Sequence, residues 1–129
     1  MMAERQPPDL VARTRAFALA TIHFYSTMPR HTVAQILGRQ LLRSATSVGA
    51  QYREAQRAKS ISDFLSKTEG ALQEVDEAGY WLELIHDSGI DTSSAAKGLQ
   101  GEATELLAIF VSITRKAKEK SCADNSVRL

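Results

Sequence analysis

The sequence predicts an all-α protein, an up-down-up-down antiparallel four-helix bundle formed by a single domain of 129 residues. Apolar side chains recur every three or four residues along almost the whole chain, and no run of alternating β-branched residues suggests a strand. The periodic segments are long and the joints between them are short, which makes neighbouring helices antiparallel. A chain of this length buries about two thirds of its unfolded surface, so its core needs neither a disulfide nor a metal.

The first helix is expected at about residues 9–28. Asp9 is a suitable N-cap, because its carboxylate can accept a hydrogen bond from the first turn. Apolar positions then recur with helical spacing from Leu10 to Met28, and Pro29 ends the segment.

The second helix is expected at about residues 30–57 and the third at about residues 61–88. Ser60 and Asp63 resemble a capping box at the start of the third helix. Its end coincides with Gly89, a residue that readily adopts the left-handed conformation found after helix C-termini.

The fourth helix is expected at about residues 92–118, with Asp91 or Thr92 as its N-cap. Charge and loss of period follow, so residues 119–129 are expected to form a disordered tail.

Basic side chains gather on one side of the second helix. At about 100° per residue, its arginines fall within an arc of about 80°, and the large aliphatic residues lie roughly opposite. The four arginines are Arg39, Arg43, Arg53 and Arg57. One side of this helix is therefore suited to burial and the other to contact with anions.

Three interpretations of these arginines remain open. The side opposite a buried stripe must be polar in any case, and arginine is a good helix former. Alternatively, guanidinium groups bind phosphates through bidentate hydrogen bonds, or they form ion pairs with a neighbouring subunit. Aromatic residues that would stack on bases are not interleaved with the arginines, since Tyr52 falls on the apolar side, so any nucleic-acid binding is expected to have little sequence preference.

The net charge of +1 conceals a strong asymmetry along the chain. Residues 30–60 carry six lysines and arginines against one acid, whereas residues 61–105 carry ten acids against two lysines. An acidic stripe on the third helix either faces arginines of another subunit or is solvated; it comprises Glu69, Asp76, Glu83 and Asp87.

Two features predict a homo-oligomer. Tyr80, Trp81 and Leu84 point away from the apolar stripe of the third helix, which indicates either a subunit interface or burial under the C-terminal tail. A run of small residues around Ser47 and Gly49 indicates a close approach to the second helix, either by another helix of the same chain or by another subunit.

The residues do not predict catalysis, a metal site or a cofactor. His23, His31 and His86 lack the spacing of metal ligands, and glycine-rich phosphate loops are absent. Glu54 has no nucleophile or second acid near it in the sequence, so it is interpreted as one half of an ion pair within its helix. No role is assigned to Cys122, and no small-molecule substrate is expected.

A cytoplasmic location without membrane association is expected. The best apolar stretch, residues 17–25, is too short and too polar to cross a bilayer. The single cysteine cannot form an intramolecular disulfide, which fits a reducing compartment.

The chain resembles the bacterial four-helix-bundle family of 23S rRNA-intervening-sequence proteins over roughly residues 10–118. The resemblance rests on the segments QLLRS at 40–44, SVGA at 47–50, YREA at 52–55, DF at 63–64 and YWLEL at 80–84. One departure is Gln51, where the family usually has asparagine.

The resemblance implies a homopentameric ring of small bundles from a bacterium. It also implies a relationship to the accessory variability protein of diversity-generating retroelements, a basic pentamer that partners a reverse transcriptase and binds nucleic acid. Transferred by position, the four arginines of the second helix are the candidates for such a basic surface.

The sequence therefore favours a non-enzymatic oligomer that binds RNA or DNA through its second helix. The alternative is a protein-interaction scaffold, or an accessory subunit of a nucleic-acid enzyme, whose arginines serve in ion pairs between subunits.

Overall fold

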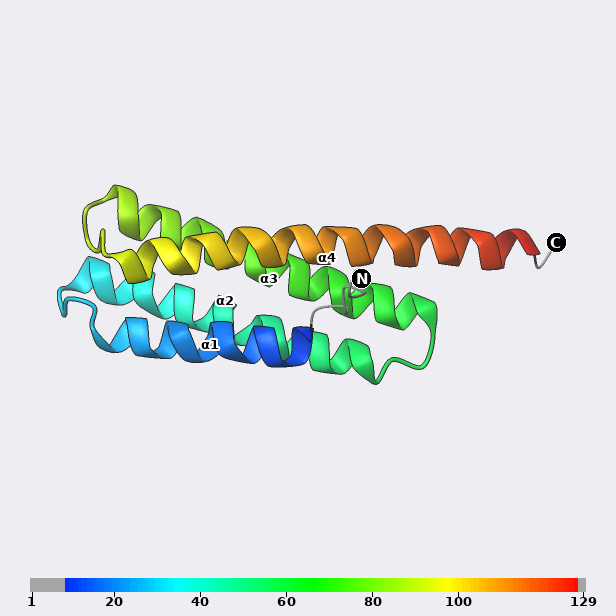
Figure 1. Ribbon diagram of the computed structural model, residues 1–129. Helices are drawn as coiled ribbons and strands as arrows, with labels where there is room; N and C mark the ends of the chain where they lie inside the picture. The colour runs from blue at the N-terminus through cyan, green and yellow to red at the C-terminus, as the bar shows by residue number, and fades with distance from the viewer. Residues whose placement is uncertain (1–8, 128–129) are drawn as a thin grey trace, which may run out of the picture.

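A computed structural model of the protein describes residues 9–127, with side chains described as far as residue 123, and this part of the chain contains four helices and no strand. The helices are α1 (Leu10–Ser26), α2 (Thr32–Gln56), α3 (Ile61–Asp87) and α4 (Ser94–Val127) (Figure 1). The all-α prediction and the number of helices are confirmed. None of these helices is long and apolar enough to cross a membrane.

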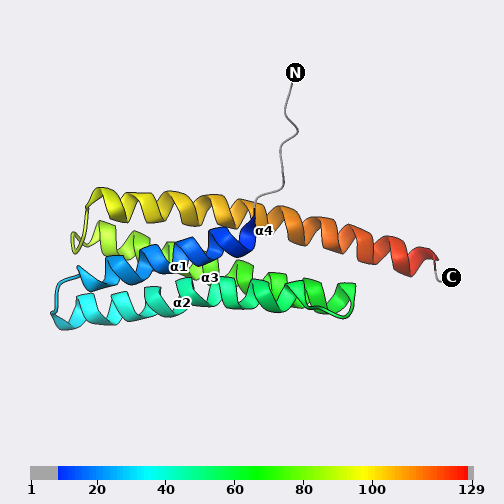
Figure 2. The same ribbon diagram turned by 60° about the horizontal axis from the view of Figure 1, so that its bottom comes forward.

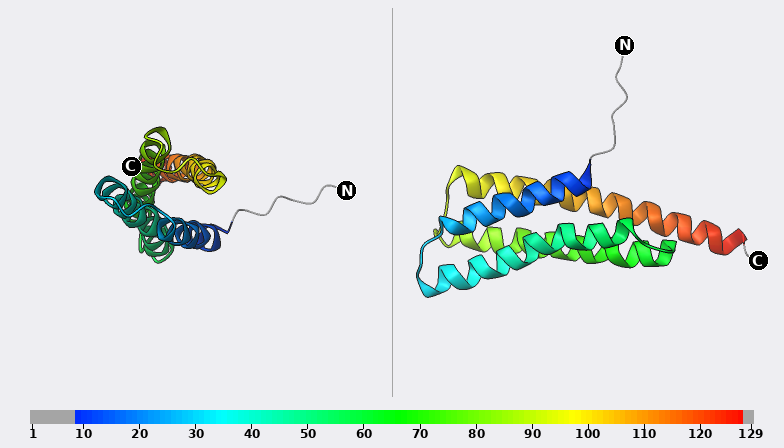
Figure 3. Two further views of the ribbon diagram at one scale, coloured as in Figure 1. Left: turned by 90° about the vertical axis from the view of Figure 1, so that its left-hand side faces the viewer. Right: turned by 90° about the horizontal axis from the view of Figure 1, so that it is seen from below.

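Consecutive helices run antiparallel and pack side by side along the bundle (Figure 1). The helix α2 packs against α1 and α3, and α3 packs against α4, whereas α1 touches α4 least. Seen from the end, the helices follow an open C with α1 and α4 at its tips (Figure 3). The contact between α1 and α4, which we call the seam, is therefore the least extensive of the contacts between neighbouring helices.

Hydrogen bonds at the helix starts confirm two of the predicted caps. The Asp9 carboxylate accepts a bond from the backbone N–H of Ala12 at 3.1 Å, and the Ser60 hydroxyl accepts one from Asp63 at 3.0 Å. The prediction for α4 is wrong, because its first turn is capped by Ser93, whose own N–H donates to the Asp91 carboxylate at 2.9 Å. Asp91 thus orders the turn two residues before the cap.

The helix ends differ from the sequence expectation at two places. The helix α1 ends at Ser26, three residues before Pro29, because the residue preceding a proline is biased away from the helical conformation. The helix α4 continues past the expected end at residue 118 to Val127 and protrudes beyond the other helices (Figure 2). Residues 119–127 contain no glycine or proline that would end the helix, and most of the predicted tail is helical. Residues 128–129 lie outside the described part.

The core runs the length of the bundle and receives side chains from all four helices. The largest fully buried residues are Phe17, Phe110, Leu41, Leu82, Ile85 and Leu106. At the end of α3, Gly89 has a φ of 79°, the left-handed conformation that the sequence predicted for this position.

The small residues of α2 permit a close approach of α1. A Cβ atom added at Gly49 would lie 3.1 Å from the hydroxyl oxygen of Thr14, which is itself buried. The contact at Gly49 is thus made within the chain, which favours the first of the two interpretations of this run.

Replacing Gly49 with leucine is expected to lower the free energy of unfolding by about 1–3 kcal/mol, because the side chain must displace α1. Gly98 provides the opposite case, since a Cβ atom there would meet nothing within 4 Å. Gly98→Ala is expected to raise the unfolding free energy by up to about 1 kcal/mol. Urea denaturation measures both, and equal effects of the two variants would contradict the close approach at Gly49.

Candidate nucleic-acid interface

The four predicted arginines are all exposed on the outer side of α2. Arg39 and Arg43 lie one turn apart, as do Arg53 and Arg57, and the last of these is the C-cap of the helix. The rise of a helix places Arg43 and Arg53 about 15 Å apart along the axis. We call these four residues the arginine face; they form two basic pairs along the outer side of α2.

Most of the arginine face carries no internal counter-charge. Arg43 forms an exposed ion pair with Glu77 of α3, with 3.5 Å between Nη2 and Oε2. Among the side chains of residues 9–123, neither Arg39, Arg53 nor Arg57 has an acidic partner. Their guanidinium groups are therefore available to an external anion.

A fifth arginine joins this surface from α1. Arg15 is exposed and lines the same shallow groove as Arg53, between α1 and α2. Sequence reasoning missed it because an isolated arginine on α1 has no visible relation to α2. Only the register of the two helices, set in part by the contact of Thr14 with Gly49, brings the two side chains to one groove.

The groove between α1 and α2 is built from small side chains. It has a volume of about 280 Å³ and is lined mainly by Val11, Thr14, Ala18, Thr46, Gly49 and Ala50. Tyr52 is turned inward and meets the ring of Phe110 edge-on, with centroids 5.7 Å apart. A surface of this kind can contact a phosphate backbone but offers no ring for stacking on bases.

Polar contacts connect α2 to α3 beside the arginine face. Glu54 pairs with Lys67 of α3 at 3.1 Å, so the prediction of an ion pair within α2 is wrong. The reason is that the register of the two helices sets Lys67 opposite Glu54, which the sequence of α2 alone cannot reveal. The amide of Gln51 packs onto Gly70, whose added Cβ would lie 2.8 Å from Gln51 Oε1. The glycine of α3 thus accommodates the longer amide at this position.

The acidic residues of α3 do not form one isolated stripe. Asp76 and Glu83 line a groove of about 600 Å³ between α3 and α4, together with Tyr80. Glu69 instead pairs with Lys118 of α4 at 3.3 Å, and Asp87 lies 3.1 Å from His86 Nδ1. The acidic charge that can meet another molecule is therefore concentrated in the groove between α3 and α4.

The predicted interface residues occupy different environments. Tyr80 is 54% exposed, whereas Trp81 and Leu84 are half-buried and Trp81 packs against the core of its own chain. The Tyr80 and Trp81 rings lie 5.2 Å apart. Ser47 is half-buried and donates a hydrogen bond to the Arg43 carbonyl at 2.8 Å.

Two apolar residues at the start of α2 are also exposed and were not predicted from the sequence as interface residues. Val33 and Ile36 are 57% and 55% exposed. Ser44 lies opposite Glu77 in the antiparallel pair of helices, so the same register sets the start of α2 beside Leu84. We call Val33, Ile36, Tyr80, Trp81 and Leu84 the apolar patch.

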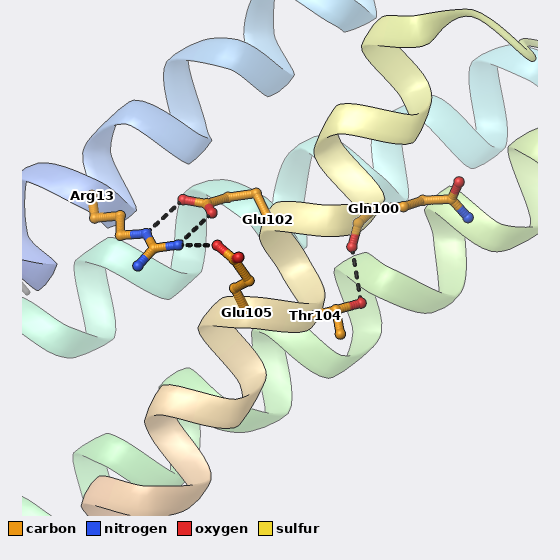
Figure 4. Close-up of polar contacts among 5 residues, drawn as sticks. All are labelled: Arg13, Gln100, Glu102, Thr104 and Glu105. Atoms are coloured by element: carbon orange, nitrogen blue, oxygen red, sulfur yellow. Dashed lines mark hydrogen bonds and ion pairs between the residues drawn. The ribbon is translucent and has the colours of Figure 1, made fainter.

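A charged clamp holds the thin seam between α1 and α4 (Figure 4). The Arg13 guanidinium donates to both carboxylate oxygens of Glu102, at 2.9 and 2.8 Å, and also contacts Glu105. One turn away, the Thr104 hydroxyl donates to the Gln100 carbonyl within α4. The hydrogen bonds from Arg13 lower the pKa of the Glu102 carboxyl, and the same bonds raise the pKa of Arg13.

Replacing Arg13 with glutamine is expected to lower the free energy of unfolding by about 1–2 kcal/mol at neutral pH. The folded-state pKa of Glu102 lies below its ordinary value of 4.5, so the clamp stabilises the fold above that pH. This contribution to the free energy of unfolding is lost as the pH falls through the folded-state pKa of Glu102. The unfolding free energy of Arg13→Gln should therefore fall less than that of the wild type over the same pH range.

Urea denaturation at a series of pH values between 3 and 7 measures the effect of the clamp. The matched control is Lys118→Gln, which removes the more exposed pair with Glu69 and is expected to change stability by less than about 0.5 kcal/mol. A similar acid response in Arg13→Gln and wild type would show that the clamp does not stabilise the seam.

Comparisons with known proteins agree with this architecture. The sequence profile of the 23S rRNA-intervening sequence protein family matches residues 9–112. No curated protein matches the chain significantly.

A similar crystal structure is that of a protein of unknown function from the S23 ribosomal protein family of Bacteroides thetaiotaomicron VPI-5482. It is 31% identical in sequence, with a TM-score of 0.75, and the match covers 81% of this chain and 97% of the other. From the extent of the profile match, the chain belongs to the 23S rRNA-intervening sequence protein family.

Proposed function

We propose that this protein is a non-enzymatic oligomer that binds the phosphate backbone of RNA or duplex DNA through the arginine face of α2. The observation that carries the proposal is that Arg39, Arg53 and Arg57 are exposed and have no acidic partner among the described side chains of residues 9–123. A guanidinium group keeps its charge at any physiological pH and forms bidentate hydrogen bonds to phosphate.

The arrangement favours contacts to phosphates over contacts to bases. The arginines lie along one side of α2 with small residues between them, and Arg15 adds a charge from α1. Without an exposed ring among them, recognition depends on charge and shape, so discrimination between sequences should be weak. The family name connects the matched proteins with 23S rRNA, which makes structured RNA the first ligand to test.

Assembly is part of the same proposal. The apolar patch includes Tyr80, Val33 and Ile36, each more than half exposed in the single chain, and association of copies would remove this surface from water. A pentameric ring is the form implied by the family resemblance. Copies arranged in a ring would present several arginine faces to one polyanion and raise the overall affinity.

The test is a fluorescence-anisotropy titration of labelled structured RNA and of labelled duplex DNA at low and at moderate salt. Binding to both ligands that weakens steeply with salt supports the proposal. Absence of binding at low salt contradicts it.

The acidic groove between α3 and α4 favours a second candidate, a protein-interaction scaffold. Its Asp76 and Glu83 are complementary in charge to the arginine face, so copies of the chain could pair through these two surfaces. An assembly held by such exposed pairs would dissociate at high salt, whereas one held by the apolar patch would not. An accessory subunit of a nucleic-acid enzyme, such as a reverse transcriptase, would use both surfaces.

A further inference from the structure

A groove lies at the end of the bundle where α2 ends and α3 begins. At this end α1 does not cover α2, α3 and α4. Thr14 of α1 lies against Gly49 of α2, so α1 begins about one turn before α2 ends. The turn between α2 and α3 and the facing part of α4 continue past α1 (Figures 1 and 3). At this end only three helices surround the core.

The floor of this groove is apolar. It has a volume of about 670 Å³. Ile61 and Phe64 from the first turn of α3 and Ile113 from α4 line it, and all three are only half-buried. Ala55 and Ala117 are buried in the same groove and leave space above their small side chains. Large apolar side chains are thus left partly open to solvent in a concave site.

The rim of the groove is basic. Lys59 from the turn and Lys116 and Lys120 from α4 line it, and no acidic residue does. All three lysines are exposed, and none has an ion-pair partner among the side chains described, those of residues 9–123. Asp63, the acid nearest in sequence to Lys59, accepts a hydrogen bond from the backbone N–H of Lys59 at 3.4 Å.

We propose that this groove binds a free single-chain carboxylate amphiphile, a ligand with an unbranched apolar chain and an anionic head. The half-buried side chains of Ile61, Phe64 and Ile113 would contact the chain, and Lys116 and Lys120 would hold the carboxylate. Ligand sites of a few hundred cubic ångströms with an apolar lining and a few convergent polar groups are the usual form of small-molecule pockets.

The apolar floor distinguishes this groove from the arginine face. A phosphate backbone has no apolar part that would occupy the space over Phe64, whereas an alkyl chain would remove its half-exposed surface from water. The three lysines would favour a carboxylate over a neutral head group. This inference is independent of the proposed nucleic-acid binding.

The test uses the full chain with isotope-labelled isoleucine methyl groups, titrated with decanoate below its micelle concentration and followed by NMR. Saturable shifts are expected at Ile61 and Ile113. Ile22 and Ile36 are exposed elsewhere and serve as internal controls that should not shift. Decanol, which has the same chain and no charge, is expected to bind at least about 10-fold more weakly.

A double variant, Lys116→Gln with Lys120→Gln, is expected to raise the Kd for decanoate by at least about 10-fold. The matched control is Lys97→Gln with Arg115→Gln, which removes the same charge from exposed positions of α4 outside the groove and should leave the Kd unchanged. Circular dichroism verifies that both variants keep their helices.

Three results would overturn the inference. The first is the absence of saturable shifts at Ile61 and Ile113. The second is equal affinity for decanoate in wild type and the double lysine variant. The third is displacement of decanoate by structured RNA, which would assign the groove to a nucleic-acid surface.

Discussion

Replacing Arg39, Arg43, Arg53 and Arg57 together by glutamine is expected to weaken binding of structured RNA and duplex DNA by about 100-fold to about 1000-fold. A hydrogen bond between a charged group and a phosphate contributes about 1 kcal/mol or more even at an exposed surface, and four of them add to about 4 kcal/mol. The lower limit allows for Arg43, which already pairs with Glu77 at 3.5 Å. Fluorescence anisotropy at constant salt measures the change in Kd.

The control for this prediction removes an equal charge from another surface. Lys97, Arg115, Lys118 and Lys120 are all exposed on α4, and their replacement by glutamine lowers the net charge by the same four units. We expect this variant to retain most of the affinity. If both variants lost affinity equally, binding would depend on the overall charge of the protein, and the assignment to α2 would be wrong.

The double variant Ile36→Asp with Tyr80→Asp is expected to convert the proposed assembly into a monomer of 14.2 kDa. Both side chains are more than half exposed in the single chain, so the substitutions should leave the bundle folded. An interface formed by the apolar patch would have to bury two carboxylates without partners, which costs several kcal/mol. Light scattering measures the mass, and circular dichroism verifies the fold.

The double variant leaves Trp81 unchanged, because Trp81 packs against the core of its own chain. Trp81→Asp would damage the fold together with any interface. The control is Leu19→Asp with Val111→Asp, two apolar residues exposed outside the apolar patch, each 39% exposed. This pair should leave the mass of the assembly unchanged. A wild-type protein that is already monomeric, or a patch variant that keeps the full mass, would contradict the interface.

The order and approximate limits of the helices could be predicted because they depend on local chemistry. Asp9 and Ser60 cap their helices through hydrogen bonds to residues three positions away. Gly89 adopts the left-handed conformation, which a glycine directly after a helix predicts from the local sequence alone. The cap of α4 was missed because three adjacent polar residues compete for the role, and Asp91 bonds to the actual cap, Ser93. The end of α4 was missed because charged residues that suggest a tail are also good helix formers.

The features that depend on pairing between helices could not be predicted. Glu54 forms an ion pair with Lys67 of α3 and not with the arginines of its own helix. Arg15 lines the same groove as Arg53 although it belongs to α1. The apolar patch likewise combines residues of α2 and α3 that the sequence separates by more than forty positions. Periodicity places each side chain on a face of its own helix, but the rotation and register of neighbouring helices decide which faces meet.

The most direct test of nucleic-acid binding by the arginine face is the salt dependence of wild-type binding to duplex DNA. Each phosphate neutralised by a cationic side chain releases condensed counterions, so four arginine contacts predict a slope of about −3.6 in a plot of log K against log salt concentration. The same plot for the four-arginine variant should be much shallower, with a slope of about −0.9 if Arg15 alone keeps its contact. A wild-type slope close to zero, or a steep slope that persists in the variant, would contradict the assignment of phosphate binding to α2.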